Sequence, residues 1–114
     1  MGEKRRVVVT GIGVIAPNGI GIDDLWNLLT YGKSGVRKIT FFDASSYPSQ
    51  MAGEVRDFDP LDYMSPKSAR RMDRFAQFAT ACTKMALDDA NLKVSDRNSD
   101  RIGIALGSAL GASA

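Results

Sequence analysis

The sequence predicts an α/β fold, in which crossover helices connect the strands of a parallel or mixed sheet. Two apolar runs, at residues 6–15 and 101–106, are typical of strands buried on both faces. Between them lie a short helical pattern, a long loop and a long helical pattern, an order typical of parallel strands joined by crossovers. The 114 residues are enough for one small domain, so we expect no boundary within residues 1–114.

The first predicted strand carries a pair of glycines that has two interpretations. Residues 11–16, GIGVIA, formally fit the dinucleotide-binding pattern G-x-G-x-x-G/A. That chemistry requires a helix to begin at the turn, so that its N-terminus faces the pyrophosphate, whereas residues 17–19, PNG, intervene here. We therefore favour the structural interpretation, in which Gly11 and Gly13 let a core strand pass close to its neighbours.

A short helix is predicted from Asp23 to about Tyr31. Asp23 and Asp24 favour the positive end of the helix dipole, and Gly32 suits a C-terminal stop. The apolar face of this helix consists of Leu25, Trp26, Leu28 and Leu29.

Residues 33–64 are less regular and predict a long loop. Within it, Met51 to Val55 predict a short strand. Asp59 and Pro60 then predict one helical turn, with Asp59 as its cap and Pro60 at the first helical position.

The longest predicted element is a helix from Pro66 to about Asn91, capped by Ser65. Its apolar residues recur at spacings of three and four: Met72, Phe75, Ala76, Ala79, Cys82, Ala86 and Ala90. Phe78, Met85 and Leu87 extend the apolar surface over much of the circumference. We therefore expect this helix to need cover on more than one side.

The second predicted strand, Arg101 to Leu106, leads into a turn of small residues at 107–112. Such a turn lets a ligand or another subunit approach the backbone, but a plain strand-ending turn explains it equally well. Two strands and a helix that is apolar on most sides cannot cover themselves, since an α/β sheet needs helices on both faces. We expect these residues to be the first part of a larger domain.

Composition and charge argue against several classes of protein. Fifteen Lys and Arg balance thirteen Asp and Glu, and a net charge of +2 gives no reason to expect a nucleic acid or a membrane as partner. No apolar run approaches the roughly 20 residues that span a bilayer. The N-terminus reaches charged residues at once, which argues against a secretory signal.

The chain also lacks much of the usual catalytic equipment. It contains no histidine and a single cysteine, Cys82. It can therefore make no Ser-His or Cys-His nucleophile pair, no disulfide and no thiolate zinc site of its own. Cys82 lies in the middle of the predicted helix among alanines, which favours a buried core thiol over a nucleophile. A lone buried thiol suits a reducing compartment such as the cytoplasm.

A cluster of cations occupies the start of the long helical pattern. Lys67, Arg70, Arg71 and Arg74 follow the spacing i, i+3, i+4, i+7, so they would share one face of a continuous helix. The N-terminus of a helix is its positive end, so four cations there are unfavourable unless an acidic partner or a carboxylate such as Asp73 compensates. A docking surface for an acidic partner and a solvated face explain the cluster equally well.

Five separated blocks of sequence resemble, in their order and at these intervals, the opening of a β-ketoacyl-acyl-carrier-protein synthase. The blocks are RRVVVTGIGVIAPNG, LWNLLTYGKSGV, FDASSYPSQMAGEV, RRMDRFAQFATACTKMALDDANL and RIGIALGSALG. Together they cover almost the whole chain, and they are most similar to synthase II and to polyketide ketosynthases.

The resemblance implies an N-terminal portion of a thiolase-like domain, dimeric in the full-length protein and cytoplasmic. Such enzymes accept an acyl group from acyl carrier protein on a cysteine at a helix N-terminus. With the help of two histidines they decarboxylate malonyl-carrier protein and condense the carbanion with the acyl thioester. None of these catalytic residues matches a position in this chain, so no catalytic residue is assigned, and no cofactor or metal is implied.

The resemblance extends to two groups of residues in this sequence. Lys67, Arg70 and Arg71 match basic positions that face the acidic carrier protein, which favours the docking interpretation of the cluster that also contains Arg74. Leu110, with Ser108 beside it, matches a position near the acyl pocket and the dimer interface.

The family's usual turn, G-S-G-x-G-G, reads GSALGA at residues 107–112. If the two alanines stand where φ must be positive, each costs about 1 kcal/mol or more. This departure puts the usual turn geometry and pocket shape in question.

Two alternatives remain open from sequence. A partner of the chain-length-factor type keeps the fold without the nucleophile, and the deciding position is not among these residues. A carrier-protein-binding or scaffold module would need no catalysis and would fold as a stable monomer at this length.

Overall fold

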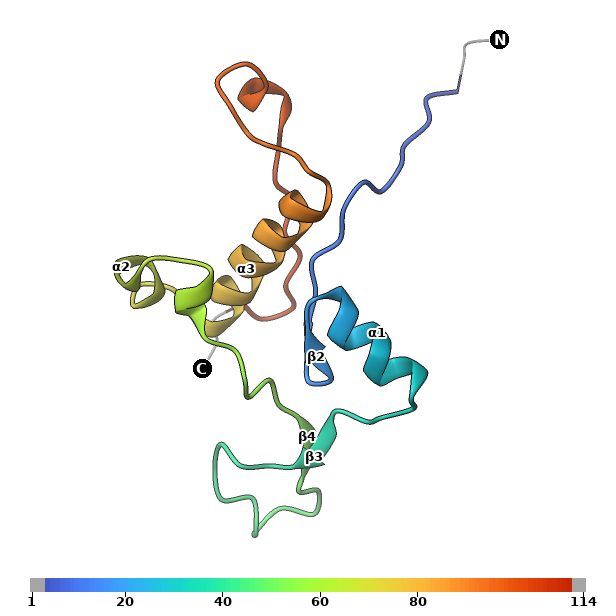
Figure 1. Cartoon of the computed structure of the whole chain (residues 1–114). Helices are drawn as coiled ribbons and strands as arrows, with labels where there is room; N and C mark the ends of the chain where they lie inside the picture. The colour runs from blue at the N-terminus through green and yellow to red at the C-terminus, as the bar shows by residue number, and fades with distance from the viewer. Residues whose placement is uncertain (1–3, 112–114) are drawn as a thin grey trace.

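The computed structural model describes residues 4–111 and contains short strands and helices joined by long connections (Figure 1). The elements follow in the order β1 (Ile15–Ala16), β2 (Gly19–Ile20), α1 (Ile22–Thr30), β3 (Val36–Lys38), β4 (Met51–Gly53), η1 (Pro60–Asp62), α2 (Pro66–Ala69), α3 (Arg74–Asp89) and η2 (Ser99–Arg101). The strands form two antiparallel pairs, β1 with β2 and β3 with β4.

Helix α1 lies within one residue of its predicted bounds and ends at the predicted glycine. Gly32 has a φ of 64°, a conformation that glycine adopts without the penalty of a Cβ. Its N–H donates to the Leu29 carbonyl at 3.0 Å, and the Lys33 N–H donates to the Leu28 carbonyl at 2.9 Å. This pair of bonds is a Schellman motif, which satisfies carbonyls that the helix end leaves unpaired.

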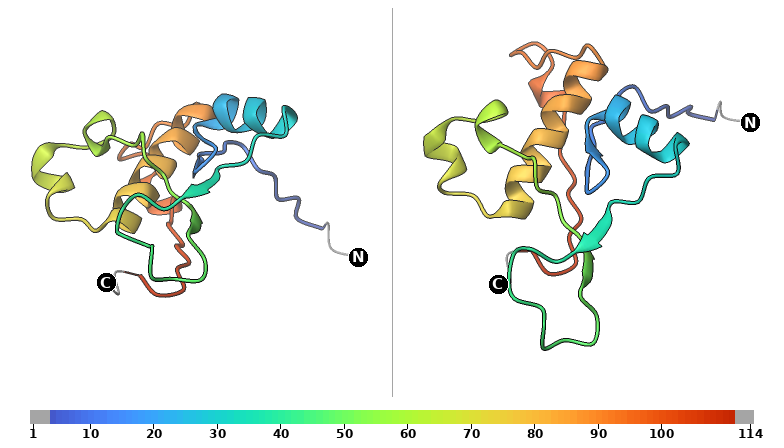
Figure 2. Two further views of the ribbon diagram at one scale, coloured as in Figure 1. Left: turned by 90° about the horizontal axis from the view of Figure 1, so that it is seen from below. Right: turned by 60° about the horizontal axis from the view of Figure 1, so that its bottom comes forward.

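The strand predicted at residues 6–15 does not form over most of that length. Only Ile15 and Ala16 are paired, in β1, and residues 4–10 run as an extended chain away from the helices (Figures 1 and 2). The side chain of Val7 is 94% exposed. A strand needs a hydrogen-bonded neighbour, and none of the described residues offers one to this segment.

The strand predicted at residues 101–106 is likewise absent. Arg101 closes the short helix η2, and residues 102–106 are extended without a strand partner among the described residues. Ile104 is 75% exposed. The parallel pairing expected between the two apolar segments is therefore not formed in this structure, and the strand β3, which the sequence did not predict, pairs with the predicted β4 instead.

The continuous helix predicted from Pro66 to Asn91 is also wrong, because it is two helices. Ser65 caps α2 as expected, accepting the Ser68 N–H at 3.2 Å, but α2 ends at Ala69 and α3 begins at Arg74. Asp73 lies between them with an extended backbone, at φ −68° and ψ 160°. Asp73 occupies the N-cap position of α3, but its carboxylate accepts no capping hydrogen bond. The carbonyls of Ala69 and Met72, which the break removes from the helical ladder, instead accept the side-chain amide of Gln77.

Helix η1 confirms the helical turn predicted at Asp59 and Pro60. The Asp59 carboxylate accepts the Leu61 N–H at 2.8 Å, and Pro60 is the first helical residue. At the far end of α3, Asn91 has a φ of 50° and closes a second Schellman motif, in which the Leu92 N–H donates to the Leu87 carbonyl at 2.9 Å.

The two glycines of the first segment lie against the backbone of α3. A Cβ on Gly13 would collide with the Cys82 carbonyl group and would stand 2.9 Å from the Met85 Cβ. A Cβ on Gly11 would collide with the Ala86 carbonyl oxygen and would stand 2.7 Å from the Ala90 nitrogen. Close approach to a helix thus explains both glycines. The space that a pyrophosphate would need is filled by α3, and α1 begins only at Ile22, so the structure supports the structural interpretation.

The described residues bury few side chains. Among them the buried apolar residues are Ala44, Phe58, Ala69 and Ala81. The radius of gyration is 17.7 Å, whereas about 13 Å is typical of a compact domain of this length. Large apolar side chains such as Trp26 stay on the surface, at 65% exposure. None of the helices within residues 4–111 has the length and hydrophobicity to cross a membrane.

Candidate functional site

The predicted basic cluster is distributed over two helices and the turn between them. Lys67 lies within α2, Arg70 follows its last residue, Arg71 lies in the turn, and Arg74 is the first residue of α3. The sequence predicted that the spacing i, i+3, i+4, i+7 would place the four cations on one helix face. That prediction is wrong, because the helix is interrupted. They remain close along the chain, since the interruption spans only residues 70–73.

The break also reverses the electrostatic argument for two of the cations. Arg70 and Arg71 stand at the C-terminal end of α2, where the carbonyl dipoles are negative and a cation is favoured. From the sequence, Arg70 and Arg71 were expected near the N-terminus of one long helix, which is its positive end. Their presence therefore needs no acidic partner to offset a dipole penalty.

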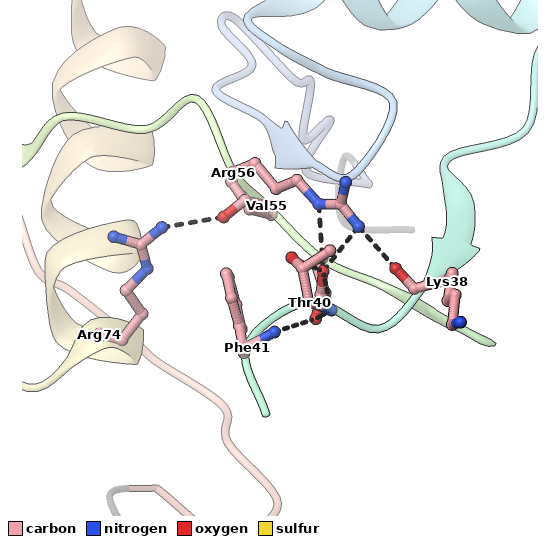
Figure 3. A network of polar contacts seen from close by, with 7 residues as sticks. Lys38, Thr40, Phe41, Val55, Arg56 and Arg74 are labelled. Carbon is pink, nitrogen blue, oxygen red and sulfur yellow. Dashed lines mark hydrogen bonds and ion pairs between the residues drawn. The ribbon is translucent and has the colours of Figure 1, made fainter. Parts of the chain in front are cut away.

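Arg74 is held by contacts within the chain. Its guanidinium donates to the Val55 carbonyl at 2.9 Å, as Figure 3 shows. The same group lies 5.2 Å from the ring centre of Phe58 and 4.9 Å from that of Phe78. A guanidinium at this distance from aromatic rings is attracted by their quadrupoles. Arg74 thus joins the start of α3 to the segment that follows β4.

Lys67, Arg70 and Arg71 are exposed, and within residues 4–111 none of the three takes part in an ion pair. We call these three residues the basic surface. Exposed, unpaired cations close together on a turn attract an anionic partner over distances of about a Debye length, roughly 8 Å at physiological ionic strength.

A network of polar contacts around Glu54 joins residues 38–41 to residues 54–56, which lead from β4 towards α2. The Glu54 side chain is 6% exposed and accepts hydrogen bonds from Thr40, from the Phe41 N–H and from the Arg56 guanidinium, with an Arg56–Glu54 ion pair of 2.8 Å. Arg56 also donates to the Lys38 carbonyl at 2.8 Å (Figure 3). Loss of hydration raises the pKa of Glu54, but the hydrogen bonds outweigh it and lower the pKa to about 2.

The sequence did not identify Glu54 and Arg56, nor a third polar residue, Gln77 on α3. Gln77 donates from its side-chain amide to backbone carbonyls of the segment that carries the basic surface. The only sequence signal for Gln77 was a polar residue within an otherwise apolar helical stretch. Glu54 lies within the strand predicted at Met51 to Val55 and Arg56 directly follows it, and that pattern is too common to have singled them out.

The predicted turn at the end of the chain is described as far as Gly111. The Ser108 hydroxyl accepts the Gly111 N–H at 2.9 Å, and Leu110 is 80% exposed. A Cβ on Gly111 would stand 3.9 Å from Phe75, so this turn lies near the start of α3. Ala109 does not have a positive φ, so the penalty considered for an alanine there does not arise, and Ala112 lies outside the described residues.

Cys82 is partly buried, so the core position predicted for its thiol is only partly reached in this structure. It lies in the middle of α3, away from both ends of the helix, and burial raises the pKa of its thiol, with a smaller opposing effect of a hydrogen bond from the Ile15 N–H. A reactive cysteine requires the opposite shift. Within residues 4–111, no group of three or more metal-ligating side chains is gathered. The arrangement described is therefore suited to binding an anionic surface, and it places no reactive group beside that surface.

Comparison with known proteins gives this arrangement a context. Residues 4–114 match the family model described as the beta-ketoacyl synthase N-terminal domain. The chain is 50% identical over 109 residues to 3-oxoacyl-[acyl-carrier-protein] synthase 2 of Coxiella burnetii, covering 96% of this chain and 26% of that protein. It is 52% identical over 107 residues to the granaticin polyketide putative beta-ketoacyl synthase 1 of Streptomyces violaceoruber, covering 93% and 25%.

A solved structure agrees with the sequence matches. The ishigamide ketosynthase/chain length factor superposes with a TM-score of 0.71 and 42% sequence identity, over 78% of this chain and 22% of that one. The chain thus spans about a quarter of the length of the relatives that it matches.

Proposed function

The chain belongs to the β-ketoacyl synthase family, and we propose that it forms the N-terminal portion, residues 1–114, of a β-ketoacyl-acyl-carrier-protein synthase with a thiolase-like fold. The full-length enzyme would elongate acyl chains in the cytoplasm by decarboxylative condensation with malonyl-carrier protein, in fatty acid or polyketide biosynthesis. The observation that carries this proposal is the match of residues 4–114 to the family's N-terminal domain.

We assign the bond-making groups of the enzyme to polypeptide beyond these residues. The chain has no histidine, and the raised pKa of Cys82 makes its thiol a poor nucleophile. The exposed apolar residues at 7–9 and 102–106 support the same assignment, because they lie in strand-forming sequences that need further strands and helices for cover.

The basic surface is the proposed docking site for acyl carrier protein. Lys67, Arg70 and Arg71 are exposed and lack ion pairs in the described structure, as expected of residues that meet an acidic partner. Arg74, predicted as a fourth docking residue, would contribute its charge from a guanidinium already bonded to Val55. Leu110 and Ser108 are proposed to lie at the acyl pocket or at the interface of a homodimer, and the exposure of Leu110 supports that role.

Charge reversal in the full-length enzyme tests the docking proposal. Lys67→Glu combined with Arg71→Glu is expected to raise the KM for acyl-carrier protein at least about tenfold, with the larger effect at low salt because exposed charges are screened by ions. The matched control is Lys84→Glu with Arg97→Glu, which reverses the same number of exposed charges elsewhere. An unchanged KM in the first variant, or an equal rise in both, contradicts the docking proposal.

A partner of the chain-length-factor type is a second candidate, because the matched solved structure contains both a ketosynthase and a chain length factor. The two differ at the nucleophile position, which this chain does not contain. Determining that residue in the full-length sequence decides between them, since a cysteine supports the synthase and any other residue supports the partner.

A scaffold module that folds alone is the remaining alternative, and the extended shape of the chain argues against it. The purified 114-residue chain is expected to aggregate or self-associate in size-exclusion chromatography, and to show no cooperative thermal unfolding as a monomer. It is also expected to catalyse no condensation. A stable monomer would support the scaffold, and turnover by this chain alone would overturn the assignment of the chemistry to other residues.

A further inference from the structure

Gln77 connects α3 to the segment that carries the basic surface. Its side-chain Nε2 donates to the Ala69 carbonyl at 2.9 Å and to the Met72 carbonyl at 3.3 Å. Both acceptors are carbonyl oxygens, so the amide group must present its NH₂ and not its oxygen to them. The side chain is partly buried, which reduces competition from water for these two bonds.

The two carbonyls that Gln77 holds flank the arginine pair of the basic surface. Ala69 immediately precedes Arg70, and Met72 immediately follows Arg71. Apart from Gln77, three backbone bonds hold this turn, from the Arg70 N–H to Pro66 at 3.2 Å, from the Arg71 N–H to Ser68 at 3.0 Å and from the Met72 N–H to Ala69 at 3.4 Å. The bond from Met72 and the Gln77 bond to Met72 are both longer than the usual N–H···O range. Gln77 therefore supplies two of these five bonds, which fix the backbone on either side of the arginines.

We infer that Gln77 is a positioning residue for docking, which sets where Arg70 and Arg71 present their charges to an acidic partner protein. Gln77 itself is not expected to touch the partner. The inference rests on the proposed docking of acyl carrier protein at the basic surface.

The test replaces Gln77 in the full-length enzyme by a residue of similar length without donors. Gln77→Met is expected to raise the KM for acyl-carrier protein about fivefold, the size of effect that goes with losing one or two neutral hydrogen bonds. The kcat, and all kinetics with a small acyl thioester that lacks the carrier protein, are expected to stay unchanged. The matched control is Thr83→Val, which removes a hydrogen bond of 2.8 Å to Ala79 on the same helix, away from the turn.

A second comparison separates positioning from general destabilisation. In a Lys67→Glu, Arg71→Glu background, Gln77→Met is expected to raise KM by less than about twofold, because residues that act through the same contact are not additive. A loss of activity that is equal for carrier-bound and small thioesters would overturn the inference, as would an unchanged KM or fully additive effects.

A further variant keeps the inference open to refutation if Gln77→Met fails to fold. Gln77→Glu retains a polar side chain but lacks the amide donors at neutral pH, and the same rise in KM is expected, with Lys84→Gln as the control for net charge.

The outcomes also separate this inference from the docking proposal. If Lys67→Glu with Arg71→Glu leaves KM unchanged, the docking proposal itself fails. If charge reversal raises KM and neither Gln77 variant does, only the role of Gln77 is wrong.

Discussion

The β3–β4 pair forms and the two extended segments at residues 4–10 and 102–106 do not pair, although strand propensity favours the opposite outcome. β3 (VRK) and β4 (MAG) contain one strong strand former, Val36, whereas the extended segments contain Val7–Val9 and Ile104, yet only β3 and β4 pair. They are joined by one connection, and the Glu54 network fastens residues on both sides of that connection. The extended segments are separated by most of the chain, and none of the described residues joins them. Pairing within reach of one loop forms in this chain, and pairing that needs further strands does not.

The largest expected effect concerns backbone protection in these two regions. In hydrogen exchange on the 114-residue chain, amides of residues 7–10 and 102–106 are expected to exchange like an unfolded peptide, because no strand covers them. In the full-length protein the same amides are expected to be protected at least about a thousandfold more. Equal protection in the two proteins would show that the segments need no additional polypeptide. The amides of β3 and β4 serve as the internal control, with a much smaller difference.

The contact of the first segment with α3 gives the next largest effect. Gly13→Ala is expected to lower the free energy of unfolding of the full-length protein by about 3 kcal/mol, because the new Cβ meets the backbone of Cys82, which cannot turn aside as a side chain can. Denaturant unfolding measures this change. Gly32→Ala, at a glycine with no atom within 4 Å of the added Cβ, is the comparison without a clash. A smaller loss at Gly13 than at Gly32 would contradict the close approach to α3.

The β3–β4 connection is expected to depend on the charge of Glu54. The folded state holds the pKa of this carboxyl at about 2, below its ordinary value of 4.5, so the folded state favours the ionised form. The stabilisation is therefore complete above about pH 4.5 and is lost as the pH falls through 2. Glu54→Gln is expected to lower Tm by a few degrees at pH 7, and the difference from the wild type should shrink steadily below pH 4.5. Thermal unfolding at several pH values checks this, with Asp96→Asn at an exposed site as control.

The smallest expected effect compares the ends of the two long helices. Both α1 and α3 close with a residue in the left-handed conformation, Gly32 in one and Asn91 in the other. Gly32→Ala is expected to cost about 1 kcal/mol of stability, and Asn91→Gly is expected to add about 0.5 kcal/mol, since glycine bears this conformation without strain. Chemical denaturation of the full-length variants measures both. Changes of the same sign would mean that backbone conformation does not decide stability at these ends.

Local signals in the sequence predicted the local structure well. The cap at Asp59, the cap at Ser65 and the stop at Gly32 all stand where they were expected, because each depends on bonds to residues a few positions away. The sequence also predicted that Gly11 and Gly13 would pack closely against a neighbouring element, although it did not identify that element as α3. The apolar pattern of residues 66–91 indicated a single helix because its periodicity continues through residues 70–73, whereas the break there is stabilised by the Gln77 side chain, a contact that periodicity does not reveal.

The candidate site was less accessible from sequence. The identities of Lys67, Arg70 and Arg71 could be proposed from charge and family resemblance, but the shared helix face was wrong once the helix broke at residues 70–73. The internal engagement of Arg74 depends on Phe58 and Val55, which lie in a different part of the sequence. The same holds for Glu54, whose partners Thr40 and Phe41 precede it by a whole loop. Contacts of this kind depend on tertiary structure, and no local pattern encodes them.

The position of Cys82 has a practical consequence for covalent labelling. Its thiol is partly buried, and Gly13 of the first segment packs against the backbone of α3 at this residue, so that segment must move away from α3 before an alkylating reagent gains full access. The rate at which this sulfur is modified would therefore report how often the first segment separates from α3, and it would not report catalytic turnover. In a screen of cysteine-directed inhibitors, adducts at Cys82 would identify compounds that react with a partly unfolded state of the protein.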